Sequence, residues 1–242
     1  MHEKTEDVRV GFFIVTTANQ IRLDTNECVI LLHGLGRFRQ SMGRLEQHLK
    51  RLGYTTINLA YPSTTKSIET IAGTHLARAV HSCEASGAEK IHFVGHSLGG
   101  IIVRQYLQQH FVPAGSRLVM LSPPNQGSEL VELLLNFPLY QWITGPAGQE
   151  IGRGPEALVH RLKPVEIEVG VIAGTSSMNP LFSFFMDGPD DGMVSVKSTE
   201  LAEMSDFITV PSTHTFIMRS PMVMKQVAHF FKYGRFDRRM TS

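Results

Sequence analysis

The sequence predicts an α/β fold with a mostly parallel central sheet that is covered by helices on both faces. Short apolar runs of strand length alternate with helical patterns from about residue 27 to the C-terminus, and such alternation is typical of parallel sheets buried on both sides. The 242-residue chain needs no metal or disulfide to support its core, since chains of this size bury roughly 70–75% of their unfolded surface. No run of about 18 apolar residues is present, so we expect no membrane-spanning helix.

The first elements follow this alternation directly. Residues 28–32 form a continuous apolar run and are expected to be a strand. A helix is expected at residues 43–52, where leucines recur at helical spacing and Gly53 closes the pattern. The next strand is expected at residues 55–60, where Pro62 stops it.

The middle of the chain repeats the pattern. A long helix is expected at residues 67–86, because its apolar side chains share one face. It is followed by a strand at residues 91–95 and by a second helix directly after Ser97. A further apolar strand at residues 117–121 is halted by Pro123 and the proline after it.

The C-terminal third adds two strands and a closing helix. The strands are expected at residues 167–173 and 207–210, and the helix at about residues 221–231. Ahead of the first strand, residues 12–16 and 20–23 have the pattern of an antiparallel ribbon. Neither an internal repeat nor a low-complexity segment interrupts the chain.

Residues 126–163 depart from the alternation. A strand-to-strand crossover needs a dozen or more residues, and this one has about 40. Ligands bind at the carboxyl edge of such sheets. We therefore interpret residues 1–242 as one domain that carries residues 126–163 as a cap over that edge. The apolar residues of 128–143 occupy more of a helix than one core-facing stripe requires. Two interpretations stay open, an ordinary buried helix and a lid or pocket wall.

Composition indicates which partners to expect. The formal charge is +1, from 23 basic and 22 acidic residues without a basic block, so we expect no nucleic-acid binding. Cys28 and Cys83 fall in a predicted strand and a predicted helix. We interpret them as two reduced, buried thiols without the neighbours of a metal site. Residues 1–7 are charged and lack an apolar signal core, which favours a cytoplasmic location.

The segment Gly95-His96-Ser97-Leu98-Gly99 is the most informative part of the chain. The pattern G-x-S-x-G between a strand and a helix is typical of a tight turn that exposes the serine hydroxyl at the sheet edge. Glycines are needed there because larger residues would collide with the neighbouring strand or helix. We predict that Ser97 is a catalytic nucleophile. The alternative is a strand-to-helix turn that merely carries a serine.

A serine hydroxyl needs a base within hydrogen-bond reach. Among 11 histidines, His214 lies in the loop after the last predicted strand, where it can fold back over the sheet edge, so we predict that it is the base. The alternative is a loop histidine with no role. His33 and His96 adjoin turns at the same edge and are interpreted as supporting residues, and His229 lies in the final helix.

The base in turn needs a carboxylate that fixes its tautomer and stabilises the imidazolium. We predict Asp191 for this role, because Gly192 permits a sharp turn beside it. Asp187 and Asp190 are the alternatives, either as solvated loop acids or as helpers of the same turn.

Negative charge on a reacting carbonyl oxygen needs hydrogen-bond donors, each typically contributing about 10²–10³ in turnover. We predict that one donor is the backbone N–H of Leu98, directly after Ser97. The other is the backbone N–H of Leu35 in the glycine-rich turn His33-Gly34-Leu35-Gly36-Arg37. Because both donors are backbone groups, the side chains at these positions vary freely.

With these motifs the chain resembles the α/β-hydrolase family, and within it the lipase and serine-esterase branch. The resemblance covers roughly residues 27–235 and implies the α/β-hydrolase fold, with its chain order of serine, acid and histidine. Secreted lipases carry a signal peptide and often a disulfide, and neither is expected here. The residues that carry the resemblance are His33-Gly34-Leu35-Gly36, residues 95–100, Ser122-Pro123-Pro124-Asn125-Gln126-Gly127-Ser128, residues 191–194 and His214.

The resemblance implies a serine hydrolase that cleaves carboxylic esters through an acyl-enzyme, without a metal or organic cofactor. The apolar segment 128–143 favours an acyl or lipid-like ester and a transient contact with a membrane or lipid surface. A thioesterase or acyltransferase with the same triad is the alternative among enzymes. Two functions without turnover also stay open, that of a catalytically silent ligand-binding homologue and that of a protein that binds membrane surfaces.

Overall fold

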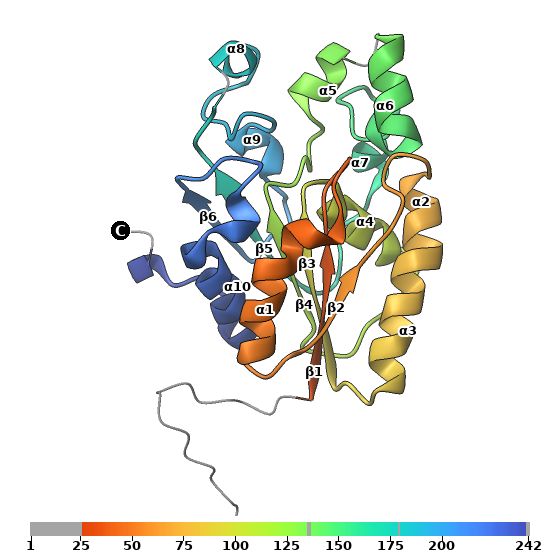
Figure 1. Ribbon diagram of the computed structural model, residues 1–242, viewed down its shortest axis with the longest axis vertical. Coiled ribbons are helices and arrows are strands. Elements are labelled where there is room, and N and C mark those ends of the chain that lie inside the picture. The colour runs from red at the N-terminus through yellow and green to blue at the C-terminus, as the bar shows by residue number, and fades with distance from the viewer. Residues whose placement is uncertain (1–25, 135–136, 179, 241–242) are drawn as a thin grey trace, which may run out of the picture.

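A computed structural model describes residues 26–134, 137–178 and 180–240 and confirms the predicted fold class. Six parallel strands form one sheet in the order β2-β1-β3-β4-β5-β6 (Figure 1). Each strand expected after residue 26 is present, with its ends shifted by one residue at most. The ribbon expected at residues 12–16 and 20–23 lies outside the described residues. The strands are β1 (Glu27–Leu32), β2 (Thr55–Leu59), β3 (Lys90–His96), β4 (Arg117–Leu121), β5 (Glu168–Gly174) and β6 (Asp206–Val210).

Two hydrophobic cores lie on the two faces of the sheet, because successive side chains of a strand point to opposite sides. Ile30 and Leu32 of β1 belong to the core that includes side chains of α2, α3 and α4. Val29 and Leu31 belong to the core that includes side chains of α1 and α10. The helices of these two layers are α1 (Gly43–Arg51), α2 (Ile68–Thr70), α3 (Ala77–Ala85), α4 (Leu98–Tyr106) and α10 (Pro221–Tyr233).

The long helix expected at residues 67–86 is present, but it is not α-helical throughout. Between α2 and α3 lies a π-helical segment, η2 (Ile71–Leu76). Ser67 caps the start of the helix, since its hydroxyl accepts from the Thr70 N–H at 3.2 Å. The apolar spacing of the sequence does not distinguish such a turn from the α-helix around it.

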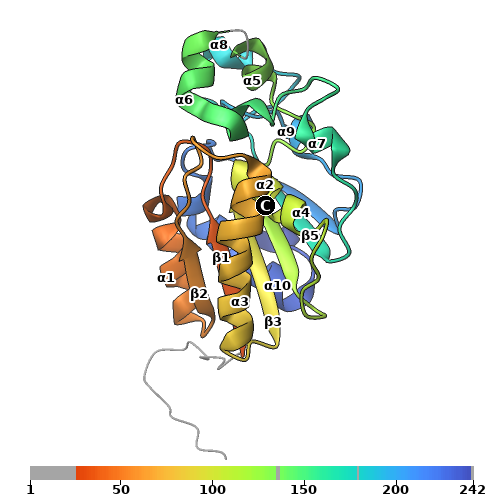
Figure 2. The ribbon, with the colours of Figure 1, turned by 90° about the vertical axis from the view of Figure 1, so that its right-hand side faces the viewer.

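The segment expected to form a cap contains α5 (Glu129–Leu134), α6 (Pro138–Gln149) and α7 (Leu158–Arg161). Figures 1 and 2 show α5 and α6 above the carboxyl ends of the strands, at the same end of the molecule as α8 (Pro180–Ser183). Leu130 and Val131 of this segment are buried, whereas Leu139 and Trp142 are exposed. No helix in the described part of the chain has both the length and the apolar character needed to cross a bilayer.

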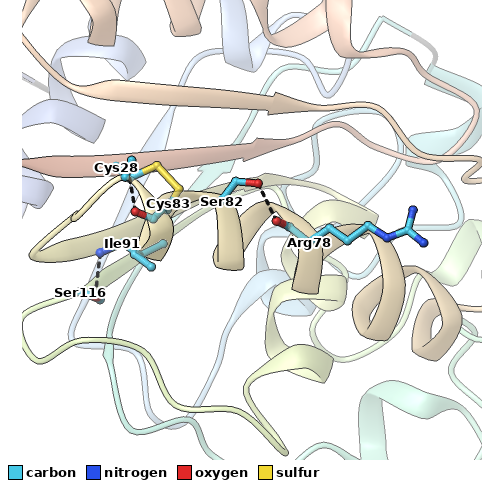
Figure 3. The surroundings of a disulfide bond; sticks show 7 residues. Cys28, Arg78, Ser82, Cys83, Ile91 and Ser116 are labelled. Carbon is cyan, nitrogen blue, oxygen red and sulfur yellow. Dashed lines mark hydrogen bonds between the residues drawn. A yellow bond between two sulfur atoms is a disulfide. The ribbon is translucent and has the colours of Figure 1, made fainter.

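Cys28 and Cys83 form a disulfide (Figure 3), so the expectation of two reduced thiols was wrong. Cys28 lies in β1 and Cys83 in α3, and their Cα atoms are 5.9 Å apart, which is within the usual range for a disulfide. The pair could not be predicted from the sequence, because the two cysteines are 55 positions apart. They meet only once α3 has packed against the face of the sheet.

Replacing both cysteines by serine is expected to lower the free energy of unfolding by about 2–4 kcal/mol, because a disulfide that closes a long loop restricts the unfolded chain. Urea denaturation of the wild type and of the double variant, each with and without reductant, measures the loss. Reduction should destabilise the wild type by a similar amount and leave the variant unaffected. Two free thiols in the denatured but unreduced wild type would contradict the disulfide.

Candidate active site

Ser97 lies in the turn between β3 and α4, where strain and close packing both favour its glycine neighbours. Its φ of 53° and ψ of −122° lie outside the regions that residues with side chains commonly adopt. A Cβ on Gly99 would lie 2.6 Å from the carbonyl oxygen of Leu32, and one on Gly95 would lie 2.6 Å from the carbonyl carbon of Gly99. Helix α4 therefore begins directly against the sheet. The Ser97 N–H donates to the Leu121 carbonyl at 2.9 Å, which anchors the turn to β4.

His214 and Asp191 come together from the loops that follow β6 and β5. Nδ1 of His214 lies 2.8 Å from Oδ2 of Asp191, and both side chains are buried. The backbone N–H of His214 also donates to the Asp191 carbonyl at 2.9 Å. Because a carboxylate accepts at Nδ1, we assign the ring proton to that atom, which leaves Nε2 able to accept a proton.

The carboxylate of Asp191 also orders its own turn. Its Oδ1 accepts from the N–H groups of Met193 at 3.1 Å and of Val194 at 3.0 Å. Burial by itself would raise the pKa of Asp191. The charge of His214 and hydrogen bonds from His214, Ser122 and the Val194 N–H outweigh that effect and hold the pKa below its ordinary value. The carboxylate is therefore ionised near neutral pH, as the partner of an imidazolium needs to be.

His96 anchors the loop that carries His214. This contact is the way in which His96 would act as a supporting residue. It is fully buried, and its Nε2 lies 2.9 Å from the backbone carbonyl oxygen of His214. Burial first, followed by the charges of His214 and Arg37, lowers the pKa of His96 well below its ordinary value. The ring is therefore neutral, and its Nε2–H donates to the carbonyl.

Ser122 supports Asp191, and the sequence patterns did not predict this role. Its φ is 45°, its hydroxyl oxygen accepts from the Gly174 N–H at 3.2 Å, and its hydroxyl donates to Asp191. The signal that could have identified it is its place at the end of β4, directly before Pro123 and beside the strand that leads to Ser97.

Asp190 and Asp187 have other partners. Oδ1 of Asp190 accepts from the Gly192 N–H at 2.7 Å and from the Ser183 hydroxyl at 3.1 Å, so Asp190 helps to shape the same turn. Asp187 forms an exposed ion pair with Lys197 at 2.6 Å. Neither of these two carboxylates has a hydrogen bond to His214 among the described residues.

Ser97 and His214 line one pocket of about 310 Å³ at the carboxyl edge of the sheet. The described residues include no hydrogen bond between the Ser97 hydroxyl and the His214 ring, and such bonds often tighten only when a ligand is bound. Val131, Thr144 and Ile151 from residues 126–163 form part of the wall, so this segment contributes directly to the pocket.

Of the two residues expected to supply oxyanion donors, Leu35 lines this pocket, and Leu98 directly follows the lining residue Ser97. Within the described residues, neither the Leu35 N–H nor the Leu98 N–H has a hydrogen-bond acceptor. Leu98 is the first residue of α4, where a helix leaves its N–H groups without intrahelical partners. The strand end before Leu35 is held by Tyr61, whose hydroxyl donates to the His33 carbonyl and whose ring stacks on the His33 ring with centroids 4.1 Å apart.

A serine on a strained turn, an imidazole nitrogen that is not bonded to the carboxylate, and the ionised carboxylate that orients the ring provide the groups for nucleophilic attack coupled to proton transfer. In the part of the chain that the structure describes, no group of three or more His, Cys, Asp or Glu side chains is placed to hold a metal ion.

Comparisons with known proteins agree with this architecture. A family model described as the alpha/beta hydrolase family matches residues 29–224. The mature form of a lipase from Bacillus licheniformis aligns with 84% of this chain and 91% of its own, at 18% identity and a TM-score of 0.71. A metagenomic carboxyl esterase aligns with 80% of this chain and 66% of its own, at 16% identity and a TM-score of 0.66. No curated protein matches the chain. At these identities the solved structures are evidence for the fold alone.

Asp191→Asn is expected to slow the reaction of Ser97 with a fluorophosphonate reagent by about 10⁴-fold, because an amide no longer holds the imidazole in the productive tautomer. Asp190→Asn is the matched control, since it makes the same change one residue earlier in a side chain that hydrogen-bonds to Gly192 and Ser183. Mass spectrometry of the labelled protein over time gives both rates. Equal rates in the two variants would exclude Asp191 from this role.

Proposed function

The chain belongs to the alpha/beta hydrolase family, and from that premise we propose that it is a serine hydrolase that cleaves carboxylic esters. One observation carries the proposal: Ser97 on a strained turn and His214, which is paired with Asp191, line the same pocket. A pocket that only bound a ligand would need neither the strained turn nor the buried hydrogen bond between His214 and Asp191.

In this proposal the Ser97 hydroxyl oxygen attacks the ester carbonyl while Nε2 of His214 takes its proton. Asp191 stays ionised and stabilises the imidazolium that forms. The tetrahedral intermediate collapses to an acyl-enzyme, and His214 returns its proton to the departing alcohol. Water then attacks the acyl-enzyme by the same steps, which releases the carboxylic acid and restores Ser97.

The oxyanion of each tetrahedral intermediate would accept hydrogen bonds from the N–H groups of Leu35 and Leu98. Their lack of other acceptors among the described residues supports this role, because donors that are already oriented need no rearrangement during the reaction.

The same groups would also serve a thioesterase or an acyltransferase, which differ in the leaving group or in the acceptor that meets the acyl-enzyme. We favour an acyl or lipid-like ester over a small polar one, because the pocket wall contains Leu35, Val131, Ile151, Met193 and Val194. Dependence of product formation on an added alcohol or thiol would separate acyl transfer from hydrolysis. A catalytically silent ligand-binding homologue is the alternative outside the enzymes, and it would not react with a fluorophosphonate.

A transient contact with a lipid surface is part of the proposal. Figures 1 and 2 show α5, α6 and α8 at one end of the molecule. Large apolar side chains of these helices and of the residues next to them are exposed to solvent. Trp142 is 81% exposed and Phe184 is 83% exposed, and apolar side chains gathered in this way mark surfaces that bind membranes or other partners. The exposed apolar side chains at this end are Leu133, Phe137, Leu139, Trp142, Met178, Phe184 and Phe185.

The domain organisation and the location are proposals too. We treat the chain as one domain with residues 126–163 as its cap, since Val131, Ala147 and Ile151 share a hydrophobic core with α3 and α4. A cytoplasmic location stays a prediction, and the Cys28–Cys83 disulfide counts against it, because disulfides persist mainly in oxidising compartments.

Ser97→Ala is expected to reduce hydrolysis of p-nitrophenyl esters to background, since loss of a triad serine costs on the order of 10⁶ in turnover. A series of esters from acetate to palmitate, assayed with the wild type and the variant, measures this loss and the preferred chain length. Activity that survives in the variant would exclude Ser97 as the nucleophile. A wild type without activity on any ester, but labelled at Ser97 by a fluorophosphonate, would favour acyl transfer or thioester hydrolysis.

Trp142→Ser combined with Phe184→Ser is expected to lower binding to phosphatidylcholine vesicles at least tenfold, because burial of each large apolar side chain contributes about 1.5–3 kcal/mol. Co-sedimentation is measured in the Ser97→Ala background, which excludes effects of catalysis. Phe111→Ser is the matched control, since Phe111 is 82% exposed and follows α4 at the opposite edge of the sheet. If the three proteins bind equally, the exposed apolar end is not the contact surface.

A further inference from the structure

Arg37 is the only formally charged side chain, histidines aside, among the described residues that line the pocket of Ser97 and His214. The other lining residues are apolar, glycine, or neutral and polar, and none of them is a carboxylate. Arg37 is neither buried nor fully exposed. Among the described residues, the lining of the pocket therefore includes a cation and no carboxylate that faces it directly.

The loop that carries Arg37 also carries the Leu35 amide. The Gly36 N–H donates to the Ser63 hydroxyl oxygen at 3.1 Å, and the Arg37 N–H donates to the Gly34 carbonyl at 3.3 Å. These two bonds hold the backbone of the turn. Arg37 and the expected oxyanion donor, the Leu35 N–H, are thus two residues apart on a turn whose backbone is held by hydrogen bonds.

No carboxylate within the described residues forms an ion pair with the Arg37 guanidinium. Burial, and after it the charge of Arg219, lowers the pKa of Arg37. Burial is also the main cause that lowers the pKa of His33 and His96, and the charge of Arg37 adds to it at both rings. Arg37 therefore places a partly buried positive charge at the pocket that Ser97 and His214 line.

A cation in that position is stabilised by an anion that enters the pocket, because a partly desolvated charge without a counterion is unfavourable. We propose that the pocket accepts an ester that also carries a carboxylate or phosphate group, and that this group binds Arg37 while the ester carbonyl lies at Ser97. This inference rests on the proposed ester hydrolysis and adds the charge of the substrate to it. Guanidinium groups bind both kinds of anion through paired, planar hydrogen bonds.

The size of the pocket limits the substrate. A volume of about 310 Å³ is at the lower end of the range for small-molecule sites, roughly 300–1,000 Å³. A short acyl chain with a terminal anion fits this volume and also suits the apolar lining contributed by Leu35 and Val131.

The first experiment compares two p-nitrophenyl esters of equal chain length, the hexanoate and the adipate monoester, which differ by one terminal carboxylate. The wild type is expected to have a kcat/KM at least tenfold higher for the adipate. In Arg37→Gln the adipate-to-hexanoate ratio is expected to fall at least tenfold, and in Arg37→Lys it should be intermediate. Arg39→Gln is the matched control, since Arg39 is an exposed arginine two residues further along the chain, and it should keep the wild-type ratio.

A wild-type ratio of one or less would overturn the proposal, as would a ratio that Arg37→Gln leaves unchanged. If neither ester is hydrolysed, the proposed function fails and a binding measurement decides the inference by itself. The affinities of the Ser97→Ala protein for hexanoate, hexyl phosphate and hexanol are measured by calorimetry. At least one of the two anions is expected to bind tenfold more tightly than hexanol does. If hexyl phosphate binds more tightly than hexanoate, the anionic group of the substrate is a phosphate. If hexanoate binds more tightly, that group is a carboxylate. Adding Arg37→Gln should abolish the difference from hexanol, and its persistence would overturn the proposal.

Discussion

The close approach of helix α4 to the sheet is the constraint on which the rest of the site depends. It brings the first residues of the helix against the ends of β1 and β3, at a distance that no side chain on Gly95 or Gly99 would permit. That contact accompanies the positive φ of Ser97 and places Leu98, whose N–H has no acceptor among the described residues, directly after the pocket-lining serine. One steric condition therefore sets both the position of the hydroxyl and that of a neighbouring donor.

The second half of the site is assembled differently, through polar contacts between loops. The segment that carries His214 is held from one side by His96, at the end of β3, and from the other by Asp191, in the loop after β5. Asp191 is itself oriented by Ser122 at the end of β4. Three adjacent strands thus each contribute one side chain that fixes the base, and each of these contacts is removed from water. Buried hydrogen bonds of this kind are costly to break, which favours a single arrangement of the loops.

The strands and the candidate site residues could be predicted from the sequence, because both depend on local residue patterns. Strands such as β4 and β5 are buried on both faces over most of their length, so they are mostly apolar. A glycine or proline lies at the end of each strand or within two residues of it. Ser97 is evident because its turn tolerates few other residues. Asp191 and His214 follow from their places after the last strands, and the structure brings them within 2.8 Å of each other. Their joint action with Ser97 in catalysis stays a prediction.

Features that depend on contacts across the fold could not be predicted in this way. Ser122 belongs to a recognisable segment, but its role depends on the separation of two strand ends. The π-helical turn of η2 leaves no mark on apolar spacing. The disulfide needs the packing of α3 on the sheet before its two cysteines are neighbours. In the sequence Arg37 is no more than the end of a glycine-rich turn, and its isolation from carboxylates is visible only once the whole pocket is assembled.

The disulfide has a consequence for how the protein withstands cleavage. The covalent link joins Cys28 to Cys83, and the chain between them includes the exposed loop around Phe38 as well as the turn that carries Leu35 and Arg37. A protease that cuts this loop produces two polypeptides, yet both remain parts of one covalent molecule. Cleavage there would give two bands on a reducing gel and a single band on a non-reducing gel. Only the backbone of the pocket-lining loop would have been opened, and both of its ends would still be tethered to the sheet.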